Sequence, residues 1–388
     1  MKGGEKILKQ AIKGEKRILI PLMILSLALI FNFCISSVSA ASGDIIYVNG
    51  SSGNDSWDGL SATWTSGTNG PKLSIKNATG AVNNGGTVNI ANGNYKGVNN
   101  TKITINKNMA IIGQSQSSTI INGTDSAWIF KIQTGATVKI ENLTIANGFV
   151  FDGPGIIYNK GNLTLNGCNF LKNSQEGSEI CVGPIYNKGT LTVIASNFIE
   201  NNAWNSGGGA IFNVGTLDVT DSNFTKNMGY GCGGAIFNYG TLTVTGSNFD
   251  GNQAYGAGGA VLNTGNLTVT GSSFTNNYAA GYGDGPIVPI AGGAIYNEYG
   301  ANYTMNSSQF SGNTPQDVYN GTKPFDNYYE GYGEDYGEGV GSFNDPGTTV
   351  KAASKNTKTI GLHETGLPFN YLILAILMVI GSLVPKRK

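Results

Sequence analysis

Between Ile157 and Asn313 the chain repeats one pattern of apolar and polar positions six times. Each copy reads roughly Gly-Gly-Ala-Ile-Phe-Asn-x-Gly-x-Leu-Thr-Val-x-Gly-Ser-x-Phe-x-x-Asn. The copies recur about every 25 residues, and such a period with short strands and Gly-rich turns is typical of a solenoid. The pattern therefore predicts stacked, nearly identical coils.

Each copy contains three short apolar segments. In the copy from Ile236 to Phe249, Leu242 and Val244 alternate with threonines, which places the apolar side chains on one face of a strand. A second segment precedes the first asparagine, and a third contains the phenylalanine. Helical spacing of apolar residues is missing, and Gly, Asn and Thr are poor helix formers. We therefore expect an all-β fold with three strands per coil.

Parallel pairing of each strand with its copy in the next coil would stack equivalent residues about 4.8 Å apart. The predicted fold is a right-handed parallel β-helix solenoid of the pectin-lyase-like type, with the handedness taken from the crossover rule. Weaker strand patterns upstream bring the total to about nine or ten coils. The first asparagines of the repeats would form a structural hydrogen-bonded ladder along the axis; they are Asn159, Asn187, Asn213, Asn238, Asn263 and Asn297.

The ends of the chain differ from the repeats. Residues 1–40 have a Lys-rich start, an apolar stretch and small residues before Ala40, which predicts a secretory signal peptide, with an uncleaved membrane helix as the alternative. Residues 41–84 are assigned to an N-terminal strand and cap, in which residues 71–82 favour a short helix. Residues 85–320 form the predicted β-helix.

Beyond the repeats, residues 321–366 are first acidic and rich in Gly and Tyr, then rich in Thr, Ser and Lys, which predicts a flexible stalk. Residues 367–385 carry no charge and precede the basic residues 386–388. This arrangement predicts a transmembrane anchor with a cytoplasmic basic tail, and a buried helix is the alternative. The protein is thus expected at the cell surface, anchored in the cytoplasmic membrane with the β-helix outside.

Composition narrows the function. Charged residues make up 12% of the chain and the net charge is zero, so nucleic-acid binding has no electrostatic basis. The single histidine is His363, and the arginines are Arg17 and Arg387, so the predicted coils lack the usual base and carboxylate-binding cations of a lyase. A polysaccharide lyase or glycoside hydrolase remains an alternative. Its candidate acids, which could equally be solvated surface residues, are Asp218, Asp221 and Asp250.

The cysteines and one acidic loop do not indicate a metal centre or a cofactor. Cys181 and Cys232 fall two coils apart, too far for a disulfide, and Cys168 occupies a phase that holds serine in later coils. We therefore expect three unpaired thiols in the mature chain. Residues 53–59 weakly resemble a calcium loop, but an Asx-rich turn explains them as well and is the favoured interpretation.

One repeated phase carries aromatic residues beside the inward isoleucine. If the isoleucines and asparagines face the core, these rings face solvent and form a stripe suited to sugar faces. An inward ladder, or a row that only stacks on itself, is the alternative. The residues are Tyr158, Tyr186, Phe212, Phe237 and Tyr296. N-glycosylation is also possible at Asn-x-Ser/Thr sequons, which include Asn77, Asn142, Asn162, Asn223, Asn266 and Asn320.

The pairing of Gly233-Gly234-Ala235-Ile236 with Phe249-x-x-Asn252 resembles the repeat of chlamydial polymorphic outer-membrane proteins. With the upstream coils and the predicted anchor, residues 41–320 resemble the β-helix adhesin-like surface proteins of methanogenic archaea. The chlamydial proteins end in an outer-membrane barrel, whereas this chain has a single apolar span. The resemblance implies an adhesin that binds cell-wall or partner-cell glycans, or a surface protein of a neighbouring cell, and it implies no catalytic residues. A purely structural envelope protein is a further alternative.

Overall fold

The computed structural model describes residues 44–177, 182–204, 207–231, 233–280 and 290–322. Within these ranges the chain forms short strands and one helix, α2 (Ile75–Ala81). No helix in the same ranges has the length and apolar character that a membrane span needs. The predicted signal peptide, nearly all of the stalk, the anchor and the basic tail lie outside the described residues.

Two sheets carry the Leu/Val and Phe strands of the repeat. Sheet 1 has ten strands: β1 (Ile45–Val48), β2 (Gly86–Ile90), β5 (Met109–Gly113), β8 (Thr137–Glu141), β12 (Asn162–Asn166), β16 (Thr190–Ile194), β20 (Thr216–Thr220), β24 (Thr241–Thr245), β28 (Asn266–Thr270) and β32 (Asn302–Asn306). Sheet 2 has nine: β3 (Gly93–Tyr95), β6 (Thr119–Asn122), β9 (Thr144–Ala146), β13 (Asn169–Leu171), β17 (Asn197–Ile199), β21 (Asn223–Thr225), β25 (Asn248–Asp250), β29 (Ser273–Thr275) and β33 (Gln309–Ser311).

Two further sheets complete the coils, one of them only from β10 onward. Sheet 3 has nine strands: β4 (Ile103–Ile105), β7 (Phe130–Ile132), β11 (Ile157–Asn159), β15 (Ile185–Asn187), β19 (Ile211–Asn213), β23 (Ile236–Asn238), β27 (Val261–Asn263), β31 (Ile295–Asn297) and β34 (Val318–Asn320). Sheet 4 has six: β10 (Phe149–Phe151), β14 (Ser174–Glu176), β18 (Asn202–Ala203), β22 (Met228–Gly229), β26 (Gln253–Ala254) and β30 (Tyr278–Ala279).

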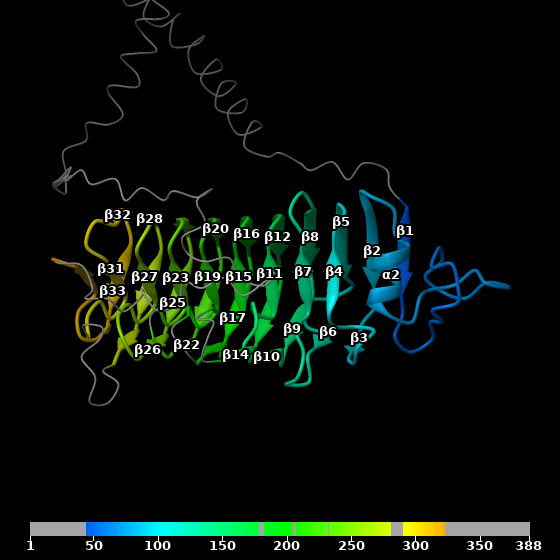
Figure 1. Ribbon diagram of the computed structural model, residues 1–388, viewed down its shortest axis with the longest axis horizontal. Helices are drawn as coiled ribbons and strands as arrows, with labels where there is room; N and C mark the ends of the chain where they lie inside the picture. Colours follow the sequence, from blue (N-terminus) through cyan, green and yellow to red (C-terminus); the bar gives the residue numbers. More distant parts are fainter. Residues whose placement is uncertain (1–43, 178–181, 205–206, 232, 281–289, 323–388) are drawn as a thin grey trace, which may run out of the picture. The chain divides into compact units, whose positions relative to one another are not determined.

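Successive coils follow one another from β1 (blue) to β32 (orange) in Figure 1. Pairing within the sheets is parallel and joins equivalent residues of the repeat; for example, Leu217 lies opposite Leu242 and Phe224 opposite Phe249. The predicted parallel β-solenoid is therefore confirmed. The three predicted strands of each coil are present, but from β10 onward the coils carry a fourth strand, which belongs to sheet 4, so the prediction of three strands per coil was incomplete. The right-handed winding stays a prediction.

Stacked apolar residues fill the interior. Leu242 and Val244 are fully buried, and the phenylalanines of sheet 2 lie face to face. The ring centroids of Phe198 and Phe224 are 4.6 Å apart with planes 2° from parallel. Since offset aromatic pairs and aliphatic burial both favour this arrangement, one repeated sequence pattern supplies a continuous core.

The first coil is capped, as the sequence predicted. Helix α2 lies at this end, and the Asp55 carboxylate accepts the backbone N–H groups of Leu73 and Ser74 before its first turn, at 3.0 and 2.9 Å. The amino group of Lys107 donates to the carbonyls of Gly80 and Val82 at the other end of the helix. These charges complement the helix dipole. The returning loop also bonds to β1, through Tyr47 N to Gly59 O (2.8 Å), so the first strand does not present a bare edge.

Sheet 4 is the element that the sequence did not predict. Its later strands are only two residues long, and their inward positions carry small residues such as Ala203, Gly229 and Ala254. Such a segment is too short to show alternation. The sequence contained a weak indication of these strands, because a small residue stands two positions after Asn201, Asn227 and Asn252. The same pattern is also typical of turns.

The paired glycines of the repeat pack against backbone. A Cβ built on Gly234 would lie 2.0 Å from the carbonyl oxygen of Gly259 in the next coil, and one on Gly209 would lie 2.1 Å from that of Gly234. No side chain fits at such distances. The Gly-Gly-Ala motif therefore allows neighbouring coils to approach closely along this segment.

We expect Gly234→Ala to destabilise the fold by about 1–3 kcal/mol, because the added methyl meets rigid backbone. Gly80→Ala is the matched control: it lies in α2 with nothing within 4 Å of a built Cβ, and it should stabilise by about 0.5–1 kcal/mol. Thermal unfolding followed by circular dichroism gives both values. Equal effects of the two substitutions would contradict the close approach of the coils.

Candidate functional site

The five repeated aromatic residues do not face solvent, so the predicted sugar-binding stripe is wrong. Their side chains expose 2% or less of their surface. They do point away from the main core, but they form a second apolar cluster together with Val182, Ala257, Leu262 and Ala291. The residues that were predicted to face solvent and are buried are Tyr158, Tyr186, Phe212, Phe237 and Tyr296.

The Gly-rich segments that precede the strands of sheet 3 cover this second cluster. A Cβ built on Gly208 would lie 2.5 Å from the backbone nitrogen of Phe237, and one on Gly292 would lie 2.8 Å from that of Tyr296. The glycines thus let these segments lie flat against the outer side of sheet 3. Alternation along a strand tells which side a residue takes, but it does not tell whether another segment covers that side.

The predicted asparagine ladder is confirmed as a structural feature. In each step one amide donates to the next; Asn187 Nδ2 lies 2.7 Å from Asn213 Oδ1 and 2.9 Å from the carbonyl of Thr216. A second ladder runs along sheet 2, where Asn227 Nδ2 lies 3.0 Å from Asn252 Oδ1. These side chains are buried and satisfied, so they stabilise turns and are not a binding surface.

The structure does not gather the three candidate acids at one site. Asp218 lies on the outer face of β20, opposite Thr192 and Thr243, as expected for an acid in the place of an outward threonine. Asp221 follows in a turn, with φ 48°. Asp250 belongs to β25 of sheet 2, and its carboxylate accepts hydrogen bonds from Thr275 Oγ1 (2.7 Å) and from the amide of Asn276 (3.0 Å).

The loop at residues 53–59 uses its oxygens as backbone caps. Asn54 Oδ1 accepts the N–H of Ser56 at 2.9 Å, and Asp58 Oδ1 accepts that of Leu60 at 2.9 Å, while Asp55 holds the start of α2. The Asx-rich turn is therefore the correct interpretation of this sequence. Across the described part of the chain, no group of three or more His, Cys, Asp and Glu could hold a metal ion.

Cys168 is a buried, unpaired thiol that takes part in a serine ladder. Its backbone N–H donates to Ser196 Oγ at 3.1 Å, and Ser196 and Ser222 repeat the same bond in the following coils. The assigned phase is therefore confirmed. Cys181 and Cys232 lie outside the described residues, and their unpaired state stays a prediction.

Most of the sequon asparagines lie at the surface. Asn223 is half-buried, and the exposed ones are Asn77, Asn142, Asn162, Asn266 and Asn320. The side chain of Asn223 donates to Asn197 Oδ1 at 2.9 Å within an outer amide row of sheet 2. N-glycosylation at these positions stays a prediction.

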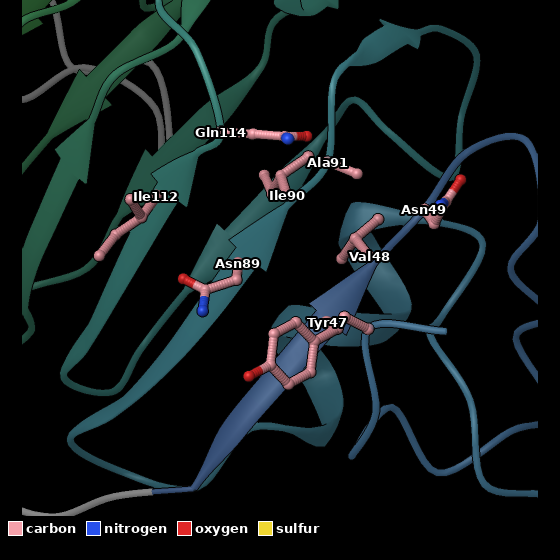
Figure 2. Close-up of a pocket in the computed structure, with 10 residues that line it drawn as sticks. Tyr47, Val48, Asn49, Asn89, Ile90, Ala91, Ile112 and Gln114 are labelled. Carbon is pink, nitrogen blue, oxygen red and sulfur yellow. The ribbon is translucent and has the colours of Figure 1, made fainter. Parts of the chain in front are cut away.

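A pocket of about 430 Å³ opens at the first coils of sheet 1; we call it the end pocket. Figure 2 shows Tyr47, Asn89 and Ile112 on three neighbouring strands, with Asn49, Ala91 and Gln114 two residues further along the chain, each just past the end of its strand. Tyr47 lies opposite Asn89, and Asn89 opposite Ile112. Ala62, from the loop between β1 and α2, also lines the pocket.

The polar groups of the end pocket are neutral amides. Asn49 Oδ1 accepts the backbone N–H groups of Ser51 and Ser52, and Gln114 Oε1 accepts that of Asn92, so both side chains are held in place. The side-chain amide of Asn89 has no hydrogen bond to another described residue. Its donor and acceptor therefore remain available beside the Tyr47 ring.

Sequence reasoning missed the end pocket because its residues do not belong to the regular repeats. Tyr47 stands on the first strand, and the adjoining wall comes from a loop that returns across β1. An aromatic residue in the first strand, followed by a long polar loop, was the available signal.

Comparisons with known proteins identify no family for this chain. It matches no family model and no curated protein. One solved structure with some similarity is ORF18 of Geobacillus virus E2, at 18% sequence identity and a TM-score of 0.28, covering 61% of this chain and 56% of the viral chain. The match thus spans little more than half of the viral protein, and at these values it carries no information about function.

The second core makes Phe237 a stability residue. Phe237→Ala should cost about 3–5 kcal/mol of unfolding free energy, because it leaves a cavity under a rigid Gly-rich segment. Tyr278→Ala, at a position that is 44% exposed, should stay within about 0.5 kcal/mol of the wild type. Urea denaturation measures both. If Phe237→Ala unfolds with the wild-type midpoint, the cluster is not a core.

Stability should fall at alkaline pH. Burial raises the pKa of the Cys168 thiol from 9.0, and that of the Tyr158 hydroxyl from 10.0, each to about 12. Above pH 9 the unfolded chain loses these protons first and binds fewer than the folded chain, so stability is complete below pH 9 and is lost as the pH rises toward 12. The melting temperature between pH 8 and 11.5 checks this. The double variant Cys168→Ser with Tyr158→Phe should reduce the fall; an identical pH dependence in this variant would contradict the assignment.

Proposed function

We propose that this protein is a cell-surface β-solenoid that binds neutral glycans through the end pocket. The pocket itself carries the proposal: a half-buried tyrosine ring and three side-chain amides line it, with Asn89 opposite the ring, and no acidic or basic residue is part of the lining. The adhesin-like repeat and the predicted membrane anchor support a role at the cell surface. Of the occupants that such a surface could contact, this lining favours a sugar.

The chemistry of the lining matches a pyranose ring. Tyr47 and Ile112 offer apolar surface for the C–H faces of a sugar, while Asn89 and Gln114 can donate to and accept from its hydroxyl groups. The volume of about 430 Å³ falls within the usual range of small-ligand pockets. Without a lysine or arginine in the lining, an anionic sugar has no counter-charge.

The place of the pocket along the chain suits an adhesin. β1 and β32 are the two edge strands of sheet 1, and the pocket lies at the β1 edge. The chain continues from β34 toward residues 321–366 and 367–385, the predicted stalk and anchor. The proposed attachment and the proposed binding site thus belong to opposite ends of the solenoid.

A structural role in the envelope is the second candidate, and the ladders favour it. Repeated polar positions such as Asn187, Asn227 and Ser222 are used inside the fold, which makes a stable spacer. For an enzyme there is no comparable observation, because Asp218, Asp221 and Asp250 come from two sheets and a turn and none of them lines the end pocket.

Binding should depend on the end pocket. We expect the full-length protein in detergent micelles to bind at least one of three neutral hexasaccharides, cellohexaose, mannohexaose or hexa-N-acetylchitohexaose, in isothermal titration calorimetry. Tyr47→Ala combined with Asn89→Ala should weaken that binding by about tenfold or more, since it removes the aromatic surface and the available amide.

Thr243→Ala is the matched control, because it lies on the outer face of the same sheet but far along the repeat. It should bind like the wild type. No binding of any probe, or equal binding by the double variant and the control with both folded by circular dichroism, would reject the end pocket as a glycan site.

A further inference from the structure

A different set of aromatic residues, one exposed and two half-buried, lies beside sheet 4. Trp204, Tyr230 and Tyr255 directly follow β18, β22 and β26 on three successive coils. Their backbone N–H groups make the same bond in turn, with Trp204 N to Gln175 O at 2.9 Å, Tyr230 N to Ala203 O at 2.8 Å and Tyr255 N to Gly229 O at 3.1 Å. They therefore occupy one phase of the coil; we call them the aromatic row.

The rings of the aromatic row stack on one another. The ring centroids of Trp204 and Tyr230 are 4.2 Å apart with planes 21° from parallel, and those of Tyr230 and Tyr255 are 4.7 Å apart at 36°. Each ring thus limits the motion of the next. A ring that is already held in place loses little further freedom when a ligand binds.

Stacking on Tyr230 covers one face of the Trp204 ring. Tyr230 has an aromatic neighbour on both sides, so only its edge can meet a ligand. Trp204 begins the row, because the preceding coil has Glu176 at the same phase. Gln175 pairs with Ala203, and Glu176 and Trp204 are the residues that follow these two. The Trp204 side chain is 38% exposed, which is unusual for so large an apolar group.

We propose that the exposed part of the Trp204 indole, with the carboxylate of Glu176 at the same phase one coil away, is a second carbohydrate subsite that takes a pyranose ring of a neutral glycan. The indole face packs against the C–H groups of the sugar, and the carboxylate accepts hydrogen bonds from its hydroxyl groups. The neighbouring side chains in sheet 4 are the amide of Asn202 and the hydroxyl of Ser174, which lies opposite it in the preceding coil.

The charge and size of this surface select the ligand. Glu176 disfavours uronates and other acidic sugars through like-charge repulsion. A partly exposed indole with polar neighbours has too little apolar area for a protein hot spot, but it suffices for the face of one sugar ring. In sheet 1, five strand steps separate β1 from β16, the strand of the Trp204 coil, which places the subsite roughly 24 Å along the axis from the end pocket. A long glycan chain could contact both sites and gain avidity.

This inference rests on the proposed function only for the class of ligand, and the two can be separated. The test uses the full-length protein in detergent, the three neutral hexasaccharides named above and hexagalacturonate as the acidic comparison. Binding is first measured in the Tyr47→Ala, Asn89→Ala background, which removes the end pocket. We expect residual binding of a neutral probe there, together with a change in tryptophan emission.

Adding Trp204→Ala to that background should abolish the residual binding, while Trp204→Phe, which retains a ring, should keep part of it. Trp128→Phe, at a half-buried tryptophan packed against the core, is the control and should leave binding unchanged. Glu176→Gln should reduce the preference for neutral over acidic probes by about threefold or more.

Two outcomes would overturn the subsite and leave the end pocket supported. In the first, Trp204→Ala does not change the residual binding. In the second, the wild type binds a neutral probe but the Tyr47→Ala, Asn89→Ala variant shows no residual binding. If Tyr47→Ala with Asn89→Ala leaves the affinity unchanged and Trp204→Ala abolishes binding, the subsite is supported and the end pocket is rejected. If the wild type binds no neutral probe, both are rejected. If Trp204→Ala unfolds the protein, two other measurements test the subsite: the residual binding of Trp204→Phe and the preference of Glu176→Gln for neutral over acidic probes.

Discussion

Parallel pairing between successive coils is the constraint on which the rest of this structure depends. Because each strand pairs with its own copy, every residue type must tolerate an identical neighbour at the strand spacing. Leucine and phenylalanine do so by packing, and asparagine does so because its amide can donate to the next while accepting from the last, as Asn187 and Asn213 do at 2.7 Å. A charged residue cannot repeat in this way inside the fold, which explains the low charge of the chain.

The same constraint produces a second core outside sheet 3. Its Gly-rich segments stack with built Cβ positions only 2.0–2.1 Å from the next coil at Gly209 and Gly234, so they lie flat and cover the rings beneath them. The rings of this second core, which would otherwise lie at the surface, thereby contribute to stability. Aromatic side chains that remain partly or largely exposed lie where these covering segments do not reach, such as the half-buried Tyr47 and the exposed Trp204.

Binding in this fold is consequently expected at breaks in the repeat. The end pocket exists because β1 is the first strand and the chain makes a loop over it before the regular coils begin. Trp204 is partly exposed where the aromatic row begins, and the preceding coil places Glu176, not an aromatic ring, at the same phase. Regular coils supply a rigid support, and departures from regularity supply distinct chemistry.

The sequence alone determined the all-β solenoid, three of its four sheets, the N-terminal capping helix and the asparagine ladder, because these features depend on local alternation and on a period along the chain. Only the tertiary structure decided whether Tyr186 and Phe237 face solvent, since covering depends on a segment that packs from outside the strand. It also decided the two-residue strands of sheet 4 and the grouping of Tyr47 with Asn89 and Ile112. Both features depend on which segments lie next to one another in space. Short or irregular segments have no repeating pattern from which such contacts could be predicted.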